Sequence, residues 1–476
     1  MRRVSRAAEA PVRHIDGVTE RSGLDARPRA TPAGPRLGRI HDRVLHVLAE
    51  VDAGAPADRA LSAAFRRARD LGSHDRAHVR DEVYGLLRHR RRARDLVERG
   101  CRALRKDPSL FEAPMRQRLE LLAHLAAEGA TLSELEARDR YAARRVPRLF
   151  ERIVQGKLPP PKHGAERAAA IETSLPDWLF RQLVQDLGLE EARALGLALL
   201  ERAPVTLRVD PRRMGRDDLL TRLAEAGIEA RPTDRAPDGL ILAERADLRD
   251  WPELSDGRAE LQDEGSQLIA LAVGAEPGDA VLDACAGAGG KTLALWSAMG
   301  GEGHLVAVEP DKKKRDALRA RLDASGAHGV EVLEGELEAL PEALRGRFDR
   351  VLVDAPCTGS GTFRRHPDLK WRLGEEDLRR EVSRQSRLLG AAVAALAPGG
   401  RLVYATCSVL RAENEAAVER LAASAPELTP ESLALGWGPE LAQALGATGA
   451  TARIGPGPGP QGPDGFFIAR LRRVLG

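Results

Sequence analysis

Cysteine is scarce in this chain of 476 residues, which contains Cys101, Cys285, Cys357 and Cys407 and no others. The four are far apart and none stands in a C-x-x-C pair, so the sequence favours neither a disulfide framework nor a structural zinc site. We therefore expect reduced thiols and no bound metal. Buried cysteines often do no more than fill space, and this is our interpretation of Cys101 and, in the main, of Cys285.

Long apolar runs are also missing. No stretch approaches the roughly 20 residues that cross a bilayer, and the arginine-rich start lacks the apolar centre and cleavage site of a secretory signal. We expect a cytoplasmic protein that is not bound to a membrane. At 476 residues the chain exceeds the size at which a single core keeps growing, which predicts two or three domains.

A large excess of one charge is absent from the chain as a whole, whose net charge is +3. Residues 1–110, however, hold 25 Arg and Lys against 15 Asp and Glu, so the front of the chain is basic and the remainder is acidic. Two interpretations of this basic region stay open. It is either a face that binds a polyanion or an ordinary solvated helix surface.

Composition and periodicity divide the chain into four parts. Residues 1–38 lack apolar periodicity and predict a disordered basic tail. Helical spacing of apolar residues over 39–165 predicts an all-helical domain, and mixed patterns over 166–262 predict a small α+β connector module. From 263 to 476, strand and helix patterns alternate, which predicts a doubly wound α/β domain with a parallel sheet.

A glycine-rich segment, LDACAGAGGKT at 282–292, leads from the first strand of that domain into a helix. An open α/β sheet binds nucleotide-like ligands at such a turn. A phosphate-binding P-loop would need glycine where Cys285 stands, and a dinucleotide fingerprint starting at Gly287 would need glycine where Thr292 stands. The spacing therefore excludes both phosphate-binding motifs.

The residues that remain suit S-adenosylmethionine as the cofactor. Asp283 ends the first strand, and Gly287 and Gly289 let the backbone approach an adenosyl group without a phosphate cradle. Glu309 ends the second strand about 20 residues later, where an acid can accept hydrogen bonds from both ribose hydroxyls. Glu336, at the end of the third strand, is placed to reach the adenine.

Two cysteines follow later strands of the same sheet. Cys357 lies in DAPC after the fourth strand, and Cys407 lies in YATC at the end of the fifth, so both should face the cofactor crevice. Thiolate addition at carbon-6 of a pyrimidine turns carbon-5 into a nucleophile able to take a methyl group. Asp354 would hold the ring at N3 and N4 as hydrogen-bond partner and proton donor, with Lys291 nearby to position the acid or the base. A second cysteine could assist product release. These residues alone leave open which sulfur attacks.

The segments CAGAGGKT, DAPCTGSGTFRRHPDLKW, YATCSVL and DGFFIARL resemble the RNA cytosine-C5 methyltransferases of the Sun (Fmu) family. RAELQDEGSQL is similar to the family's approach to the first strand. The likeness is greatest to bacterial members that methylate small-subunit ribosomal RNA, whose N-terminal helical domain resembles the transcription factor NusB. LGSHDRAHVRDEVYGLLRHRRR, in residues 71–92, looks like the core of that domain.

The resemblance implies a role for each cysteine, with Cys407 as the nucleophile and Cys357 serving product release beside Asp354 and Lys291. It also implies a cofactor site made of Cys285, Ala286, Gly287, Ala288, Gly289, Gly290 and Lys291, with Glu309, Glu336 and Asp354. The chain departs from the family in two places: Gly287-Ala288 replaces the usual Ala-Pro, and Glu309 and Glu336 replace aspartates.

RNA is the partner that this resemblance implies, and we expect a monomer. TFRRHPDLKW, at 362–371, is predicted to contact RNA by base stacking and through its charges. Two other functions stay open: methylation of transfer RNA, and a non-catalytic role in transcription or ribosome assembly. Intact Asp354, Cys357 and Cys407 argue against the second.

Overall fold

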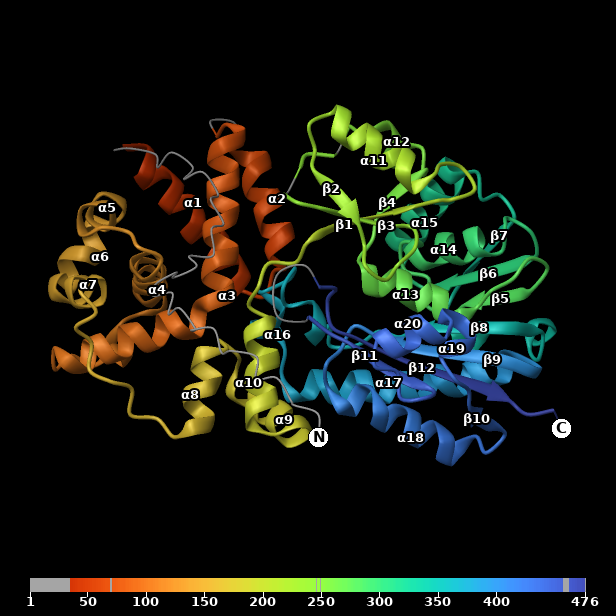
Figure 1. Cartoon of the computed structure of the whole chain (residues 1–476). Helices are drawn as coiled ribbons and strands as arrows, with labels where there is room; N and C mark the ends of the chain where they lie inside the picture. Colours follow the sequence, from red (N-terminus) through yellow and green to blue (C-terminus); the bar gives the residue numbers. More distant parts are fainter. Residues whose placement is uncertain (1–34, 69–70, 245, 249, 457–461, 476) are drawn as a thin grey trace, which may run out of the picture.

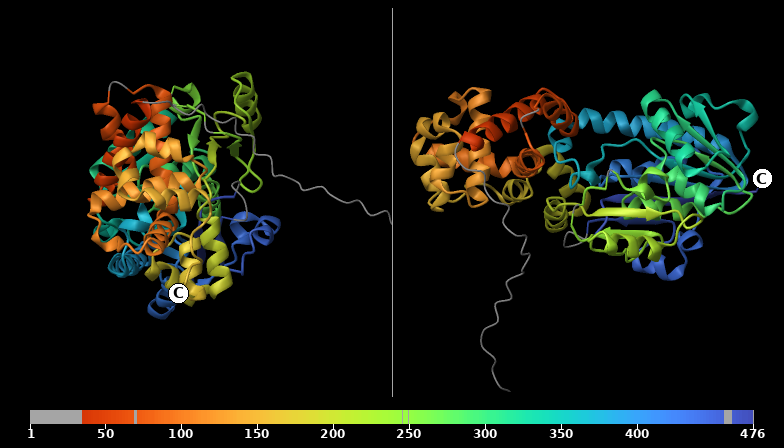
Figure 2. Two further views of the ribbon diagram at one scale, coloured as in Figure 1. Left: turned by 90° about the vertical axis from the view of Figure 1, so that its left-hand side faces the viewer. Right: turned by 90° about the horizontal axis from the view of Figure 1, so that it is seen from above.

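The computed structural model describes residues 35–68, 71–244, 246–248, 250–456 and 462–475. The predicted tail at 1–38 lies outside them except for its last four residues, which begin the first helix. Helices occupy one end of an elongated molecule and the main sheet occupies the other, with a smaller sheet beside it (Figures 1 and 2).

No strand occurs among the described residues between 35 and 204. The helices of the front part are α1 Pro35–Asp52, α2 Ala57–Arg67, α3 Ser73–Ala103, α4 Ala113–Ala127, α5 Leu132–Arg138, α6 Arg140–Arg145 and α7 Pro147–Val154. Apolar residues of α1, α2 and α3, including Ile40, Leu48 and Leu86, form one of its cores. The long helix α3 runs through this part and reaches the rest of the molecule (Figure 1).

Three further helices, α8 Ala165–Glu172, α9 Asp177–Leu187 and α10 Leu189–Ala198, precede a four-stranded antiparallel sheet of order β2-β3-β1-β4. Its strands are β1 Val205–Val209, β2 Ala230–Pro232, β3 Gly239–Leu242 and β4 Ala259–Leu261, and the helices α11 Arg216–Glu225 and α12 Pro252–Ser255 accompany them. Phe180 of α9 packs with Phe363 and Leu410, which lie in loops of the main sheet. These helices therefore support the loops that follow the later strands.

The main sheet has the order β10-β12-β9-β8-β5-β6-β7, with β11 paired to β12. Five strands are parallel: β5 Ala280–Asp283, β6 His304–Glu309, β7 Val330–Glu334, β8 Phe348–Asp354 and β9 Leu396–Thr406. The others are β10 Leu428–Pro430, β11 Thr451–Ile454 and β12 Phe466–Arg473. The helices of this part are α13 Glu264–Val273, α14 Gly290–Ala298, α15 Lys312–Ser325, α16 Leu369–Arg372, α17 Glu375–Ala395, α18 Glu415–Ser424, α19 Ala434–Trp437 and α20 Pro439–Ala444.

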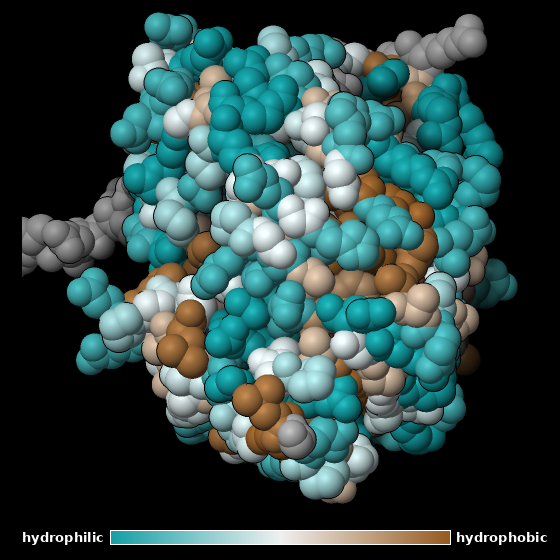
Figure 3. All heavy atoms as spheres, turned by 90° about the vertical axis from the view of Figure 1, so that its right-hand side faces the viewer, coloured by the Kyte–Doolittle hydropathy of each residue, from teal (hydrophilic) through white to brown (hydrophobic). Residues whose placement is uncertain are grey.

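Helices cover both faces of this sheet. Leu268 of α13 and Leu295 of α14 belong to the core on one face, and Leu388 of α17 and Leu421 of α18 belong to the core on the other. The predicted fold class, a doubly wound sheet preceded by an α+β module and an all-helical part, is confirmed. The side of the molecule at the right of Figure 1 is mainly hydrophilic with smaller apolar areas (Figure 3).

One feature of the sheet differs from the prediction, which made all of its strands parallel. The last strand, β12, lies antiparallel to β9, with Phe467 opposite Thr406 and Leu471 opposite Leu402. A strand buried on both faces has the same apolar run whichever way it points, so the sequence pattern does not encode its direction.

Within the described residues, no helix combines the length and the apolar character that spanning a membrane requires.

Candidate active site

The predicted site residues come together where parallel strands end at one edge of the main sheet. Asp283, Asp354 and Thr406 are the last residues of β5, β8 and β9, which are neighbours in the sheet. In the strand register Asp354 lies opposite Ala405, and Asp283 lies opposite Leu352. The loops after these strands therefore share one crevice, as open α/β sheets provide for ligands.

The two cysteines face each other in this crevice. The Sγ atom of Cys357 lies 3.4 Å from the Sγ atom of Cys407, and the backbone N–H of Gly361 donates to the carbonyl of Cys407 at 2.9 Å. The hydrogen bond with Cys407, together with burial, raises the pKa of Cys357 well above its usual range. Cys357 is therefore a neutral thiol near pH 7.

Lys291 and Asp354 form an ion pair beside the cysteines. Lys291 lies in the first turn of α14, and its Nζ donates to Asp354 Oδ2 at 2.7 Å. Burial acts to lower the pKa of Lys291, but the carboxylate of Asp354 and, more weakly, Cys407 raise it overall. In the resting site Lys291 is therefore positively charged, orients Asp354 and acts electrostatically on Cys407.

A buried carboxyl group joins the loops that carry the cysteines. Glu413 is fully buried and accepts hydrogen bonds from Thr358 N at 2.8 Å, Thr358 Oγ1 at 2.5 Å and Ser408 Oγ at 2.6 Å. Gln385 donates to both Glu413 Oε1 at 3.1 Å and the carbonyl of Pro356 at 2.9 Å. Burial raises the pKa of Glu413 despite these bonds.

Thr358 directly follows Cys357 and Ser408 directly follows Cys407, so Glu413 connects the two sulfur-bearing turns. Sequence reasoning missed this residue. The hydroxyl residue after each cysteine was the available signal, because two buried hydroxyl groups need a shared polar partner.

The glycine-rich loop leaves room for a ligand. Gly287 and Gly289 have φ of +57° and +93°, in the left-handed region that favours glycine. A Cβ on Gly289 would lie 2.4 Å from Leu318 Cδ1, whereas a Cβ on Gly287 would meet nothing within 4 Å. Gly289 thus allows close packing of the loop on α15, and open space lies in front of Gly287.

Glu309 is held against this loop. Its Oε2 accepts from the backbone N–H of Gly287 at 2.9 Å and its Oε1 accepts from that of Asp311 at 2.8 Å. Each carboxylate oxygen can accept a second hydrogen bond, such as one from a ribose hydroxyl. Burial raises the pKa of the neighbouring Asp283 to about 6, and Thr292 Oγ1 donates to its Oδ2 at 2.7 Å.

Gln262 provides a further polar group at the loop. Both polar atoms of its side chain are buried and lack a hydrogen-bond partner within the described residues, and its Nε2 lies 3.5 Å from the position of a Cβ on Gly290. Open space, a tethered acid and an unsatisfied amide fit the ribose and amino-acid portions of S-adenosylmethionine. Gln262 was not among the predicted site residues, although the RAELQDEGSQL segment contains it.

Two predicted cofactor residues lie less centrally. Glu336 stands two residues beyond the end of β7, its side chain is 54% exposed, and it lies 3.9 Å from Arg384. The structure therefore places it on the surface of this edge without a contact to the glycine-rich loop. Cys285 is partly buried, and its raised pKa, caused by burial, makes it unreactive. Cys101 is fully buried in a helical core, as predicted for a space-filling cysteine.

The predicted RNA-contact segment at 362–371 has a different role in the structure. Arg364 and Lys370 are buried, and Lys370 Nζ donates to the carbonyl of Arg88 at 2.8 Å. Trp371 Nε1 donates to the carbonyl of Leu87 at 2.6 Å. Carbonyls of α3 thus occupy Lys370 and Trp371, and Arg364 donates instead to the carbonyls of Gly462 and Arg202. The prediction that these side chains stack on bases and bind phosphates is therefore wrong.

The physical reason is a kink in α3. His89 has non-helical dihedral angles of φ −110° and ψ 16°, and the carbonyls just before it need donors that the helix does not supply. Lys370 and Trp371 supply them, and Arg88 Nη2 donates in return to the carbonyl of Arg364 at 2.8 Å. The loop that begins at Cys357 is thereby fixed to the helical part.

Arginines of the basic run in α3 are also engaged internally. Arg90 pairs with Asp52 and with Glu120, the latter at 2.8 Å, and Arg92 Nε donates to the carbonyl of Glu172 at 2.6 Å. These guanidinium groups hold helices together. The number of arginines in this part of the sequence therefore overstates the positive charge that the surface of α3 presents.

The doubly wound sheet, the glycine-rich loop after its first central strand and the acid at the end of the next define an S-adenosylmethionine-dependent methyltransferase of the Rossmann-like class. The family description "16S rRNA methyltransferase RsmB/F" matches residues 270–472, and a ferredoxin-like domain of the same family matches residues 175–249. The chain belongs to the RsmB/F family of ribosomal RNA methyltransferases. S-adenosylmethionine is the methyl donor in this family.

Curated relatives agree with this assignment. Ribosomal RNA small subunit methyltransferase B of Pseudomonas putida is 35% identical over 315 residues, which cover 65% of this chain and 69% of that protein. Probable ribosomal RNA small subunit methyltransferase B of Synechocystis is 28% identical over 420 residues, 85% of this chain and 92% of the relative.

Two solved structures are similar to this one. The crystal structure of PH0851 has a TM-score of 0.73 and 24% identity over 93% of this chain and 100% of that one, which supports the fold. A methyltransferase homolog protein from Pyrococcus horikoshii has a TM-score of 0.55 and 26% identity over 66% of this chain and 100% of its own.

Proposed function

We propose that this protein methylates carbon-5 of a cytosine in small-subunit ribosomal RNA through a covalent bond between Cys407 and carbon-6. The observation that carries the proposal is the pair of Sγ atoms 3.4 Å apart beside the Lys291–Asp354 ion pair. Methylation of a nitrogen or a ribose hydroxyl needs no thiol. Carbon-5 of cytosine is a poor nucleophile that thiolate addition activates, so two thiols in the crevice favour this reaction.

Addition begins when the Cys407 thiolate bonds to carbon-6 and electron density moves through the ring toward N3. Asp354 is placed to hydrogen-bond the N3 and N4 edge, and Lys291, whose raised pKa keeps it protonated, supplies the proton that N3 takes up. Carbon-5 of the resulting enamine takes the methyl group. S-adenosylmethionine supplies that group as an electrophile.

Release requires loss of the carbon-5 proton and of the sulfur. N3 returns its proton to Lys291, and a water molecule acts as the base that removes the carbon-5 proton. The carbon-5 to carbon-6 double bond forms again, and Cys407 leaves with the bonding electron pair. The neutral Cys357 thiol, 3.4 Å away, is positioned to give its proton to the departing sulfur. The proposed roles therefore match the surroundings of the two sulfurs. The neutral Cys357 thiol can donate a proton, and Cys407 lies in the field of the Lys291 ammonium group and attacks.

The residues that would hold the methyl donor are the loop from Cys285 to Lys291, with Glu309 and Gln262 beside it. Glu309 would bind the ribose hydroxyls and Gln262 the polar amino-acid end. Glu336 would contact the adenine from the surface, and Asp354 would lie next to the transferred methyl group. We place this activity in the cytoplasm.

Ribosomal RNA is proposed over transfer RNA because the curated relatives are named for small-subunit ribosomal RNA. We also propose that the helical part, residues 39–165, contributes to RNA binding, as the NusB resemblance implies. Any such contact uses side chains other than the arginines that hold α3 to its neighbours.

Bisulfite sequencing of total RNA tests the proposed function directly. RNA from a deletion strain should convert at one ribosomal cytosine that is protected in the parent strain, and expression of the wild-type chain, but not of Cys407→Ala, should restore protection. Protection that persists in the deletion strain would contradict the proposal. Loss of protection at a transfer RNA cytosine would redirect it to the other RNA class.

A further inference from the structure

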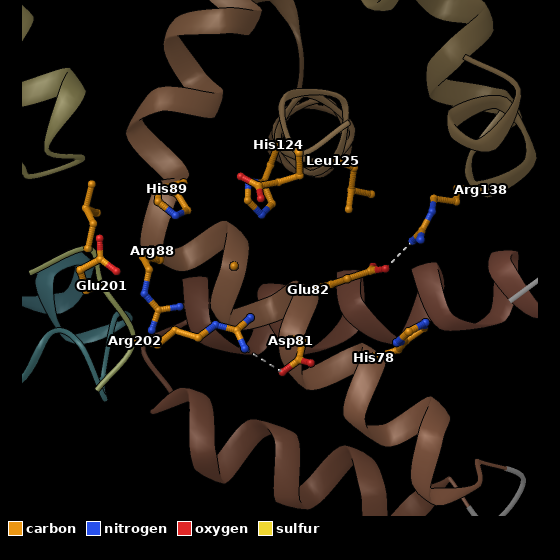
Figure 4. Close-up of a pocket in the computed structure, with 13 residues that line it drawn as sticks. His78, Asp81, Glu82, Arg88, His89, His124, Leu125, Arg138, Glu201 and Arg202 are labelled. Atoms are coloured by element: carbon orange, nitrogen blue, oxygen red, sulfur yellow. Dashed lines mark hydrogen bonds and ion pairs between the residues drawn. The ribbon is translucent and has the colours of Figure 1, made fainter. Parts of the chain in front are cut away.

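The charged side chains between α3 and α4 stay within the helical part. They surround a pocket of about 430 Å³ whose lining includes His89, His124 and the ion pair of Arg138 with Glu82 at 2.6 Å (Figure 4). None of the residues assigned to the methyl-transfer site lines this pocket. A different group of charged side chains, between the connector module (residues 166–262) and α15, does reach the glycine-rich loop.

Glu260 is the central residue of that second group. It lies in β4, a strand at the edge of the four-stranded sheet, and is 7% exposed. Arg208, opposite it in β1, donates from Nη2 to Glu260 Oε2 at 3.1 Å. Arg321 of α15 donates to Glu260 Oε1 from Nε at 3.1 Å and from Nη2 at 2.7 Å. Because charged donors occupy both carboxylate oxygens, Glu260 is fixed in place and orients the guanidinium group of Arg321.

Arg321 uses its remaining nitrogen to hold the glycine-rich loop. Its Nη1 donates to the backbone carbonyl of Ala288 at 2.7 Å. Ala288 stands between Gly287 and Gly289, which both have positive φ. Glycine leaves the backbone more conformations than any other residue, so the sequence of this segment does little to fix the peptide group after Ala288. The hydrogen bond from Arg321 supplies that restraint.

Glu309 and Arg321 together hold the segment Gly287–Ala288 at both of its ends. Glu309 accepts from the N–H of Gly287 at 2.9 Å, which fixes the peptide group that enters the segment. Arg321 fixes the peptide group that leaves it. The space in front of Gly287 is where the methyl donor is proposed to bind, so the conformation of this segment should determine how well the donor fits.

We propose that Arg321 is a positioning residue for S-adenosylmethionine. It holds the segment Gly287–Ala288 in the conformation that binds the methyl donor, and Glu260 orients it for this role. A segment without this restraint must be ordered when the donor binds, which lowers the affinity. The connector module thereby acts on cofactor binding through Arg321. The inference rests on the proposed function, because it places the donor at the glycine-rich loop.

Calorimetric titration of the full chain with S-adenosylmethionine tests this role. Arg321→Ala should bind the donor roughly three- to tenfold more weakly, because the Ala288 carbonyl loses its charged donor. Glu260 keeps Arg208 as a partner in this variant, so the fold should be retained. Arg321→Lys keeps the charge but not the planar fork that spans both acceptors, and should recover part of the affinity. The matched control is Arg319→Ala, an exposed arginine of the same helix, which should bind like wild type.

Steady-state kinetics distinguish positioning from a loss of folding. In Arg321→Ala the KM for S-adenosylmethionine should rise roughly three- to tenfold, whereas kcat at saturating donor should stay within about twofold of wild type. A residue that only stabilised the fold would lower the melting temperature and leave this KM unchanged. Unchanged donor affinity in folded Arg321→Ala overturns the proposal. An equal loss in Arg319→Ala also overturns it, because the effect would then belong to the overall charge of α15.

A double-mutant cycle tests the part played by Glu260. Glu260→Gln should weaken donor binding in the wild-type background and have no further effect in Arg321→Ala, because both changes act through one contact. Additive losses would overturn the link between Glu260 and Arg321.

Glu309→Ala distinguishes a failure of this role from a failure of the proposed cofactor site. If donor affinity is unchanged in both Glu309→Ala and Arg321→Ala, the donor does not bind at this loop and both proposals fall. If it is unchanged in Arg321→Ala alone, the site stands and the positioning role of Arg321 is wrong. Donor binding is measured without RNA, so neither result depends on which base is methylated.

Discussion

The sulfur atoms of Cys357 and Cys407 lie 3.4 Å apart at the ends of two neighbouring parallel strands. At this separation both can reach the same bond of one pyrimidine ring, but their surroundings differ. Cys407 has the Lys291 ammonium group in its field, whereas the raised pKa of Cys357, due to its hydrogen bond with Cys407 and to burial, keeps it protonated. This asymmetry leads to the assignment of attack to Cys407 and of release to Cys357.

Substitution of each cysteine should stop the reaction at a different step. Cys407→Ser should abolish methylation and form no adduct, because a serine hydroxyl without an activating base is hardly ionised at neutral pH. Cys357→Ser should still attack and transfer the methyl group but remain bound to RNA. A denaturing gel run after incubation with S-adenosylmethionine should show a slow band for Cys357→Ser alone.

The double variant is the control for that experiment. It should give no band, since without addition there is nothing to trap. A stable adduct in Cys407→Ser and none in Cys357→Ser would reverse the two roles.

The Lys291–Asp354 pair should govern the rate of addition. Lys291→Met removes the proton source and leaves Asp354 without its partner, so we expect the single-turnover rate to fall about 10²- to 10⁴-fold. Lys291→Arg keeps the charge without the geometry and should recover part of the loss. Rapid-quench assays measure both rates, with Lys312→Met, an exposed lysine, as the control. Equal rates in Lys291→Met and wild type would remove this pair from the chemistry.

Glu309 should control affinity for the methyl donor. Glu309→Ala removes a charge-assisted contact worth about 1.5 to 3 kcal/mol, which corresponds to roughly 10- to 100-fold weaker binding. Calorimetric titration with S-adenosylmethionine measures this, and Glu342→Ala, an exposed acid beyond β7, is the matched control. An unchanged dissociation constant in a folded Glu309→Ala protein would show that this carboxylate does not bind the ribose.

Local sequence patterns predicted the elements and the edge of the sheet where the site lies, because strand-end positions follow from alternation of strands and helices. They did not predict the burial of Arg364 and Lys370. Arg and Lys are mostly exposed in proteins, and the carbonyls that bind these two belong to segments far away in the chain. Glu413 was missed for the same reason, since its partners Thr358 and Ser408 come from two different loops.

The buried histidines make a prediction about pH. The folded-state pKa of His124, lowered to about 4 by burial, lies below its ordinary value of 6.5, so the unfolded chain binds more protons as the pH falls. The contribution of His124 to stability is therefore complete above pH 6.5 and is lost between pH 6.5 and 4. At pH 5 this loss is about 2 kcal/mol.

Melting temperatures at pH 7.5 and pH 5 test this prediction. His124→Asn should show a smaller fall in Tm between these values than wild type does. Asp283 has the opposite effect on stability as the pH falls, because burial raises its pKa, but this effect is the same in wild type and in His124→Asn. The exposed His328→Asn should behave like wild type. If Tm of His124→Asn falls between pH 7.5 and pH 5 by as much as that of wild type, the acid sensitivity belongs to other groups.

Glu413 should act by holding the two cysteines at reacting distance. All of the groups that contact it are donors in the structure, namely Thr358 N, two hydroxyls and the Gln385 amide. Glu413→Gln keeps the volume but turns an amide N–H₂ toward some of these donors. Because an unsatisfied buried group costs about 1 to 3 kcal/mol, we expect kcat to fall roughly 10- to 100-fold, with unchanged binding of RNA and S-adenosylmethionine.

The distance between the sulfurs gives a readout that distinguishes positioning from folding. Diamide takes two electrons and two protons from a pair of close thiols and leaves a disulfide, so wild type should form the Cys357–Cys407 disulfide rapidly. Glu413→Gln should form it more slowly because its two turns are no longer tied together. Glu415→Gln, two residues further along and paired with Arg453 at the surface, should match wild type in both kcat and oxidation rate. If Glu413→Gln melts at a lower temperature while its disulfide forms at the wild-type rate, the residue stabilises the fold and does not position the cysteines.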